Sequence, residues 1–264
     1  MSRTAIIAGQ GALAPAVAAS LDNPVVAALE GFAPPLAHET FRLERLVPFF
    51  DWLSEQDVAR VTFAGAVRRP RLDPEAFDPR TASLVPRILT AMQSGDDAAL
   101  REVIALFEEA GFQVVGTAEI CPDLVPEAGI LVGEPTAADI ADADRAAVIV
   151  EGLGALDLGQ GAVVAQGLCL AVETLPGTAA MLDFVALHRD MRPRPNGARG
   201  VFWKAPKPVQ DRRVDLPAIG PDTVDQAARA GLAGIAWQAG GVIMLERETV
   251  LERARDAGIF LWAR

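Results

Sequence analysis

Residues 4–21 read TAIIAGQGALAPAVAASL and decide the fold of the first half of the chain. The apolar run at residues 4–8 predicts a buried strand, and the alanine-rich residues 12–21, with a proline in the first turn, predict a helix. The glycine turn at residues 9–11 separates the two elements. A strand that leads through a glycine turn into a helix is typical of the first unit of a Rossmann-like α/β layer.

The same alternation continues along the first half. Strands that alternate with helices predict a parallel sheet. The apolar runs at residues 24–29, 58–64 and 112–116 predict further strands, and residues 83–92 and 97–110 predict helices.

Near residue 130 the sequence becomes rich in glycine and proline, and its apolar residues show little helical periodicity. We therefore predict two α/β domains joined by a short linker at residues 127–135. Residues 1–130 form a Rossmann-like domain with a parallel sheet, and residues 131–264 form a mixed sheet with helices. In the second domain we expect helices at residues 139–156, 181–189, 223–230 and 249–257, and strands at residues 162–165, 168–173, 234–237, 241–245 and 259–262.

The composition excludes several classes of protein. The 264 residues include 24 Lys and Arg against 35 Asp and Glu, a net charge of −11, which argues against nucleic acid as a main partner. The two cysteines, Cys121 and Cys169, lie in apolar stretches and predict buried thiols, without a disulfide framework. No run approaches the ~18 apolar residues of a membrane span. The N-terminus lacks the plan of a signal peptide, so we expect a cytoplasmic protein.

Residues 200–223 read GVFWKAPKPVQDRRVDLPAIGPDT and contain four prolines, which predict a stiff loop. Residues 199–215 include five basic and two acidic side chains, a local charge of +3 on an acidic protein. Such a cationic island predicts an anionic ligand. The alternative, a solvated loop whose charges pair with one another, stays open. We define the island by the cations Lys204, Lys207, Arg212 and Arg213 and the carboxylates Asp211 and Asp215.

Cations neutralise phosphate oxygens, and carboxylates hold Mg²⁺ or orient water, so the island has the groups that phosphate chemistry needs. Asp211 and Asp215 are the candidate Mg²⁺ ligands. The candidate catalytic residues are Asp211, Asp215, Lys204, Lys207 and Arg213.

Other polar or glycine positions at the ends of predicted strands are candidates for substrate binding. A glycine turn before a helix lets backbone N–H groups approach a phosphate, and ligands of open α/β sheets lie outside the carboxyl ends of strands. Structural turns, exposed loops and helix caps are the alternatives. The candidates are Gly9, Gln10, Gly11, Gly65, Arg69, Gln160, Glu173, Gly177, Thr178, Gln210, Gly220 and Thr223.

Several segments together resemble the LpxI family of UDP-2,3-diacylglucosamine pyrophosphatases, from residue 6 nearly to the C-terminus. In the first half the resemblance rests on GQGALAPAVA, FAGAVRRP and SGDDAAL. In the second half it rests on GEPTAADIADA, LDLGQGAVVAQG, AVETLPGT, KAPKPVQDRRVDLPAIGPDTV and AGLAGIAWQAG. The lysine-, proline- and aspartate-rich stretch is specific to that family, whereas the glycine turn is not.

The resemblance implies a role in lipid A biosynthesis. Members hydrolyse UDP-2,3-diacylglucosamine to UMP and 2,3-diacylglucosamine 1-phosphate (lipid X) by attack of water on the α-phosphorus, and Mg²⁺ supports the reaction. It also implies two α/β domains with the site between them. A lipid-linked UDP-sugar requires an apolar pocket for two acyl chains. We accordingly expect a catalytic, lipid-binding C-terminal domain, peripheral contact with the inner membrane, and lipid X that stays bound through purification. A homodimer remains open.

The chain departs from the family pattern around Glu173. That pattern runs roughly EAIEGTDAML, whereas residues 173–182 read ETLPGTAAML, so Pro176 replaces a Glu and Ala179 replaces an Asp. The departure keeps a second function open, namely a noncatalytic lipid- or nucleotide-binding protein of the same fold.

Overall fold

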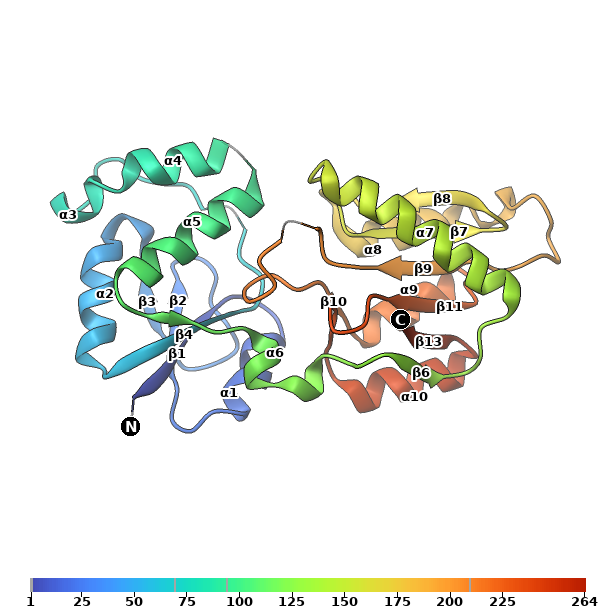
Figure 1. Ribbon diagram of the computed structural model, residues 1–264, viewed down its shortest axis with the longest axis horizontal. Helices are drawn as coiled ribbons and strands as arrows, with labels where there is room; N and C mark the ends of the chain where they lie inside the picture. The colour runs from blue at the N-terminus through green and yellow to red at the C-terminus, as the bar shows by residue number, and fades with distance from the viewer. Residues whose placement is uncertain (1, 69, 94, 209) are drawn as a thin grey trace. The chain divides into compact units, whose positions relative to one another are not determined.

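The structure is a computed structural model that describes residues 2–68, 70–93, 95–208 and 210–264 (Figure 1). Its contacts divide the chain into two units. The N-terminal unit comprises Met1–Pro122 together with Asp211–Asp215, and the C-terminal unit comprises Asp123–Gln210 together with Leu216–Arg264. The domain limits of 1–130 and 131–264 stay predictions.

The N-terminal unit is built on a five-stranded sheet in the order β3-β2-β1-β4-β5. Every pairing in it is parallel, which confirms the predicted sheet, and the order is that of a Rossmann-like layer. The strands are β1 (Arg3–Ala8), β2 (Val25–Leu29), β3 (Glu39–Phe41), β4 (Val58–Ala64) and β5 (Gln113–Val114). The helices are α1 (Leu13–Ala19), α2 (Leu46–Glu55), α3 (Pro79–Ala82), α4 (Val85–Gln93), α5 (Asp96–Glu109) and α6 (Thr117–Ile120), with 3₁₀ turns at Leu43–Arg45 and Pro122–Leu124.

The core of the N-terminal unit is rich in phenylalanine. The rings of Phe41 and Phe49 stack with centroids 4.0 Å apart, and Phe107 meets Phe50 edge to face at 4.9 Å. Helix α2, which carries Phe49 and Phe50, was not among the predicted elements. It has two adjacent aromatic residues and a proline in its first turn, so its apolar positions form a run that hides the helical period.

The C-terminal unit contains a mixed six-stranded sheet in the order β6-β13-β11-β9-β7-β8. Its three central strands, β13, β11 and β9, are parallel, and β6 and β7 pair antiparallel at either side. The strands are β6 (Gly129–Val132), β7 (Gly161–Ala165), β8 (Leu168–Val172), β9 (Val201–Lys204), β11 (Gly234–Trp237) and β13 (Phe260–Ala263). A separate parallel pair consists of β10 (Ala218–Ile219) and β12 (Ile243–Met244).

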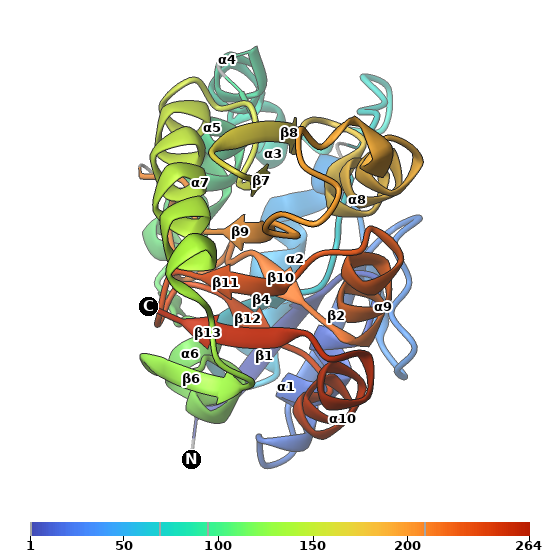
Figure 2. The ribbon, with the colours of Figure 1, turned by 90° about the vertical axis from the view of Figure 1, so that its right-hand side faces the viewer.

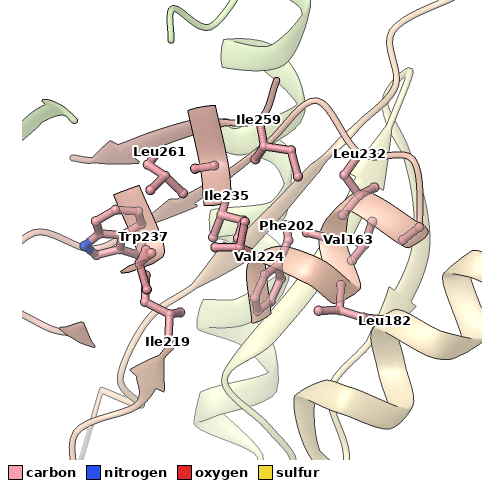
Figure 3. Packing of buried hydrophobic residues seen from close by; sticks show 14 of the residues in the cluster. Val163, Leu182, Phe202, Ile219, Val224, Leu232, Ile235, Trp237, Ile259 and Leu261 are labelled. Carbon is pink, nitrogen blue, oxygen red and sulfur yellow. The ribbon is translucent and has the colours of Figure 1, made fainter. Parts of the chain in front are cut away.

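Helices cover both faces of this sheet. Helix α7 (Ala137–Ala155) lies on one face, and α8 (Gly177–Leu187), α9 (Pro221–Arg229) and α10 (Arg247–Ala257) lie on the other (Figure 2). The fully buried side chains of Phe202, Ile235 and Trp237 form the core under α8, α9 and α10 (Figure 3). A short 3₁₀ turn, Arg189–Met191, follows α8.

Two expectations about local structure were wrong. Residues 129–132 were expected to lie in a linker, yet they form β6, whose partner β13 lies far along the chain. Residues 201–204, expected to lie in a loop, form the buried strand β9. A strand that is buried on both faces carries no polar alternation, and it is therefore easily missed in a sequence.

The two cysteines differ in environment. Cys121 is buried as predicted, whereas Cys169 is exposed on the edge strand β8, which contradicts the expectation of two buried thiols. An edge strand has a neighbour on one side only, and an apolar sequence does not reveal its place in the sheet. Among the described residues, no helix is long and apolar enough to cross a membrane.

Candidate functional site

A buried ionic cluster lies at the carboxyl ends of β8 and β9. Both strands run opposite to β7, so their carboxyl ends lie at the same edge of the sheet. Lys204 ends β9, and its Nζ lies 3.3 Å from Oε2 of Glu173, the residue that follows β8. The Lys204 ammonium also donates to Oγ1 of Thr178 at 2.5 Å, and the Thr178 hydroxyl donates to Glu173 Oε2 at 2.9 Å.

A glycine allows the pair to meet across the intervening strand. Gly161 of β7 is the register partner of Lys204, and its carbonyl accepts from the backbone N–H of Glu173. A Cβ at Gly161 would lie 2.6 Å from Glu173 Oε2, so only glycine leaves the path between carboxylate and ammonium open. At Gly159 a Cβ would lie 2.0 Å from the carbonyl oxygen of Glu173. The two glycines therefore form a cradle around Glu173.

The charged side chains of the Lys204–Glu173–Thr178 cluster are largely excluded from solvent. The side chains of Lys204 and Glu173 are 5% and 10% exposed. Gln160, between the two cradle glycines, has a buried Oε1 atom with no hydrogen-bond partner among the described residues. A desolvated ammonium beside a hydroxyl, at the carboxyl edge of a sheet, is suited to binding a phosphate oxygen. The predicted residues Lys204, Glu173 and Thr178 are thus brought together.

Sequence reasoning missed Trp237, which ends β11 and pairs in register with Lys204. Its side chain is fully buried, and its indole N–H finds no acceptor among the described residues. Figure 3 shows the indole nitrogen pointing away from the packed apolar cluster. A buried donor without a partner is a candidate for a ligand contact. The available signal was a tryptophan at the end of a predicted strand.

The proline-containing loop after β9 is closely packed, as its composition predicts. A Cβ at Gly154 would lie 2.7 Å from Cδ of Pro208, and one at Gly241 would lie 3.0 Å from Cδ of Pro206. The backbone N–H of Lys207 donates to Oε1 of Gln210 at 2.9 Å. This contact gives Gln210, one of the predicted binding residues, a role in shaping the loop.

The charge partner of Lys207 was not predicted. Lys207 Nζ forms an ion pair with the carboxylate of Asp157, a residue with a left-handed backbone (φ 55°) in the turn after α7. The 50 positions between the two residues hide this contact from the sequence. Lys207 therefore has a carboxylate partner within its own unit.

The segment Asp211–Asp215 clusters with the N-terminal unit. The Arg213 guanidinium donates to both carboxylate oxygens of Asp211, with Nε–Oδ1 at 3.1 Å and Nη2–Oδ2 at 2.8 Å, and it also contacts Glu108 Oε1 at 2.6 Å. The hydrogen bonds from Arg213 hold the pKa of Asp211 below its usual range. Val214 packs against the apolar core of this unit. The segment is therefore an ordered part of the N-terminal unit.

The predicted cationic island is divided between the units. Lys204 and Lys207 contact acids of the C-terminal unit, whereas Asp211 is held by Arg213 in the N-terminal unit. We expected all four cations to surround Asp211 and Asp215, and that arrangement stays a prediction. Strand β9 carries Lys204 to the sheet edge of the C-terminal unit. The pairing of Asp211 with Arg213 agrees with the alternative that charges of the loop neutralise each other.

The fit to Mg²⁺ is incomplete in the described residues. They contain no group of three or more His, Cys, Asp or Glu side chains able to hold a metal ion. Mg²⁺ often binds through one or two carboxylates together with substrate phosphates and water, so Asp211 and Asp215 stay predicted ligands. Both oxygens of Asp211 already accept from Arg213, so a metal ion there would share this carboxylate with the arginine.

The glycines of the N-terminal unit bring two strand ends together. Backbone N–H and C=O groups of Gln10 and Ala66 exchange hydrogen bonds of 2.9 Å beyond the ends of β1 and β4. A Cβ at Gly9 would lie 2.6 Å from the Ala66 oxygen, and one at Gly65 would lie 2.7 Å from backbone atoms of Gly9. The N–H of Gln10 is thus engaged within the protein, and α1 begins only at Leu13.

The remaining predicted residues have different structural roles or lie outside the described part of the chain. The Thr223 hydroxyl accepts from the backbone N–H of Gly220 at 3.2 Å and so caps α9. Gly177 begins α8 with a left-handed backbone (φ 84°), which directs Thr178 to Lys204. Arg69 lies outside the described residues. Substrate binding by the N-terminal candidates Gly9, Gln10, Gly11 and Gly65 stays a prediction.

An open hollow of about 550 Å³ lies elsewhere in the C-terminal unit. It is lined by Glu134, Thr136, Arg199 and Arg255, and by Phe260 at the amino end of β13. Lys204 and Trp237 lie at the carboxyl ends of their strands, so this hollow is at the opposite edge of the sheet from the ionic cluster. It is therefore not part of the candidate site.

Comparison with known proteins covers both halves of the chain. The model for the LpxI N-terminal domain matches residues 3–124, and the model for the LpxI C-terminal domain matches residues 127–262. A relative from Caulobacter vibrioides, the UDP-2,3-diacylglucosamine pyrophosphatase LpxI, is 44% identical over 203 residues, which cover 76% of this chain and 72% of the relative. On these matches, the chain belongs to the LpxI family.

Proposed function

We propose that the chain hydrolyses UDP-2,3-diacylglucosamine to UMP and lipid X, in lipid A biosynthesis, by attack of water on the α-phosphorus. The observation that carries the proposal is the dry Lys204–Glu173–Thr178 cluster in a chain that is 44% identical to a pyrophosphatase. Attack on the anhydride increases negative charge on the phosphate oxygens, and a fixed cation stabilises that charge without reorganisation.

The residues take distinct roles in this proposal. The Lys204 ammonium neutralises a phosphate oxygen, and the Thr178 hydroxyl donates a second hydrogen bond to it. Glu173 holds the ammonium in place through their ion pair. Lys207 and Arg213 add positive charge. The Thr223 hydroxyl, which caps α9 in the structure, is a further candidate donor to phosphate.

Asp211 and Asp215 complete the proposed machinery. One of the two carboxylates orients the attacking water, and Asp211 and Asp215 are the proposed Mg²⁺ ligands. When bound, Mg²⁺ would supply charge neutralisation at the pyrophosphate. We further propose a cytoplasmic protein that contacts the inner membrane peripherally to obtain its lipid substrate. A homodimer stays a proposal without a residue assignment.

The test is release of UMP from UDP-2,3-diacylglucosamine in detergent micelles, with Mg²⁺ and with EDTA. We expect release with Mg²⁺, and a loss of at least ~10²-fold for Lys204→Met, since removing a group that stabilises transition-state charge has this size of effect. Exposed Arg229→Met on α9, whose Asp183 partner is also exposed, is the matched control and should retain activity. No UMP release under any metal condition would reject the hydrolase.

A noncatalytic lipid- or nucleotide-binding protein is the second candidate. Ala179 is exposed in the first turn of α8 and Pro176 precedes this helix, where the family pattern has an acid at each position. If the missing Asp served catalysis, the cluster would still bind a phosphate but would not turn it over. Native mass spectrometry that shows bound UDP-sugar or lipid X, together with no UMP release, would favour this function.

A further inference from the structure

We propose that the outer face of α8 and the arginine-containing loop after it dock this protein on an anionic lipid bilayer. We call this surface the α8 face and define it by the apolar residues Leu175, Phe184, Leu187 and Met191 and the basic residues Arg189 and Arg194. The proposal rests on the proposed function for its purpose, which is access to a lipid substrate. Its physical basis is the exposure of the apolar side chains, the positive charge of the arginines and the packing of the loop that carries them.

The α8 face exposes several large apolar side chains. Helix α8 buries Met181, Leu182 and Val185 in the core of the C-terminal unit. Its opposite side presents Phe184, 50% exposed, and Leu187, 82% exposed, at a spacing of three residues, so the two share one side of the helix. The next turn exposes 76% of Met191, and Leu175, before the helix, is 96% exposed.

Basic residues follow the apolar stripe directly. Residues 189–199, RDMRPRPNGAR, contain four arginines and one aspartate, a charge of +3 on a chain whose net charge is −11. Arg189 and Arg194 are exposed. The His188 ring lies against Phe184, with ring centroids 4.1 Å apart. The ring adds an amphipathic side chain to the α8 face. Exposed apolar side chains flanked by arginines match an anionic lipid surface, in which apolar groups enter the interface and cations meet headgroups.

The loop that carries these arginines is held in one shape. The Gln166 side chain donates to the carbonyls of Arg194 and Ala198 and accepts from the Arg194 N–H. Arg192 Nη2 donates to the Ala230 carbonyl at 2.7 Å. The face is therefore ordered before it meets a partner, and docking would not require the loop to fold.

Charge favours a bilayer over a second copy of the chain as the occupant. In a symmetric dimer through this face, each protomer would bring the same arginines to the interface, where like charges repel. The net negative charge of the chain is repelled by anionic headgroups, whereas the exposed arginines of the α8 face are attracted to them.

The experiment is co-sedimentation of the full chain with vesicles of phosphatidylglycerol and phosphatidylcholine, or of phosphatidylcholine alone. We expect binding to the anionic vesicles that weakens with salt. Leu187→Glu, and separately Arg189→Ser with Arg194→Ser, should each lower the bound fraction about tenfold or more. Val148→Glu, an exposed valine (60%) on α7 at the other face of the sheet, is the matched control and should bind like wild type.

Three results would overturn the proposal. They are no binding to anionic vesicles, equal binding by Leu187→Glu, or sedimentation velocity that shows a dimer which Leu187→Glu converts to a monomer. The last result would mean that a second copy covers the α8 face. UMP release from substrate in detergent micelles separates this question from the proposed function, because Leu187→Glu should keep that activity when its far-ultraviolet circular dichroism is unchanged.

Discussion

The Lys204 ammonium and the Glu173 carboxylate lie 3.3 Å apart in the interior of the C-terminal unit, although 31 positions separate them in the chain. The two residues end different strands, and Gly161 lies between them on β7. A buried charged pair has lost most of its hydration. The attraction between the two charges offsets part of the free energy that this loss costs.

This pair predicts a strong energetic coupling. Glu173→Gln and Lys204→Met should each lower the free energy of unfolding by about 3–5 kcal/mol, because each removes a close opposite charge from a buried ion pair. The double variant should lose less than the sum of the two, as urea unfolding at neutral pH would measure. Additive losses would show that the two side chains do not interact in solution.

The close contact between Gly161 and Glu173 predicts that one added methyl group at residue 161 lowers the stability of the protein. Gly161→Ala should destabilise the protein by about 1–3 kcal/mol and displace Glu173, because the added Cβ would overlap its carboxylate. Gly152→Ala is the matched control: its Cβ would meet nothing within 4 Å inside helix α7, and it should stabilise by about 0.5–1 kcal/mol. Thermal unfolding of both variants compares them directly, and equal shifts would refute the cradle.

The Asp211–Arg213 pair predicts a stability that depends on pH. The pKa of Asp211 is lowered from 3.8 in the folded protein by hydrogen bonds from Arg213, so the carboxylate stabilises the fold above its unfolded pKa. This contribution is lost as pH falls below 3.8 and through the folded pKa. The stability difference between wild type and Asp211→Asn should be constant near neutrality and shrink in acid. Urea midpoints from about pH 3 to pH 7 would measure it, and a difference that grows in acid would contradict the assignment.

The proposed hydrolase predicts that Asp211→Ala and Asp215→Ala each lower kcat by at least ~10²-fold, a barrier increase of about 3 kcal/mol. The fold should persist, because the segment is stabilised by Val214 in the core as well as by its charges. Steady-state UMP release with Mg²⁺ measures kcat. Near-wild-type turnover by both variants would remove these acids from the chemistry.

Restoring the family's Asp at position 179 is predicted to raise the hydrolase activity. Ala179→Asp restores the acid at an exposed position in the first turn of α8, where a carboxylate also suits the helix N-terminus. If the chain is limited by that missing group, UMP release should rise by ~10-fold or more. Ala180→Asp, at the next exposed position, is the control and should not raise it. Unchanged turnover in an active wild type would show that this chain does not use the position.

Local patterns in the sequence were sufficient to predict several helices and strands of both units. The strand–glycine–helix pattern at residues 4–21 predicted β1 and α1, and the periodicity of residues 139–156 predicted α7, because these elements are decided by neighbouring residues. The two apolar runs predicted as strands at residues 162–165 and 168–173 form β7 and β8, which pair as an antiparallel hairpin.

The sequence by itself also singled out Lys204, Glu173 and Thr178 as candidates, but it did not show that they touch. That contact exists because β8, β7 and β9 pair in a particular register and because Gly161 carries no side chain. Likewise, only the folded chain places Asp211–Asp215 in the N-terminal unit and Lys207 beside Asp157. Such pairings are set by packing between distant segments, whose free energy belongs to the whole unit and leaves no local periodic signal in the sequence.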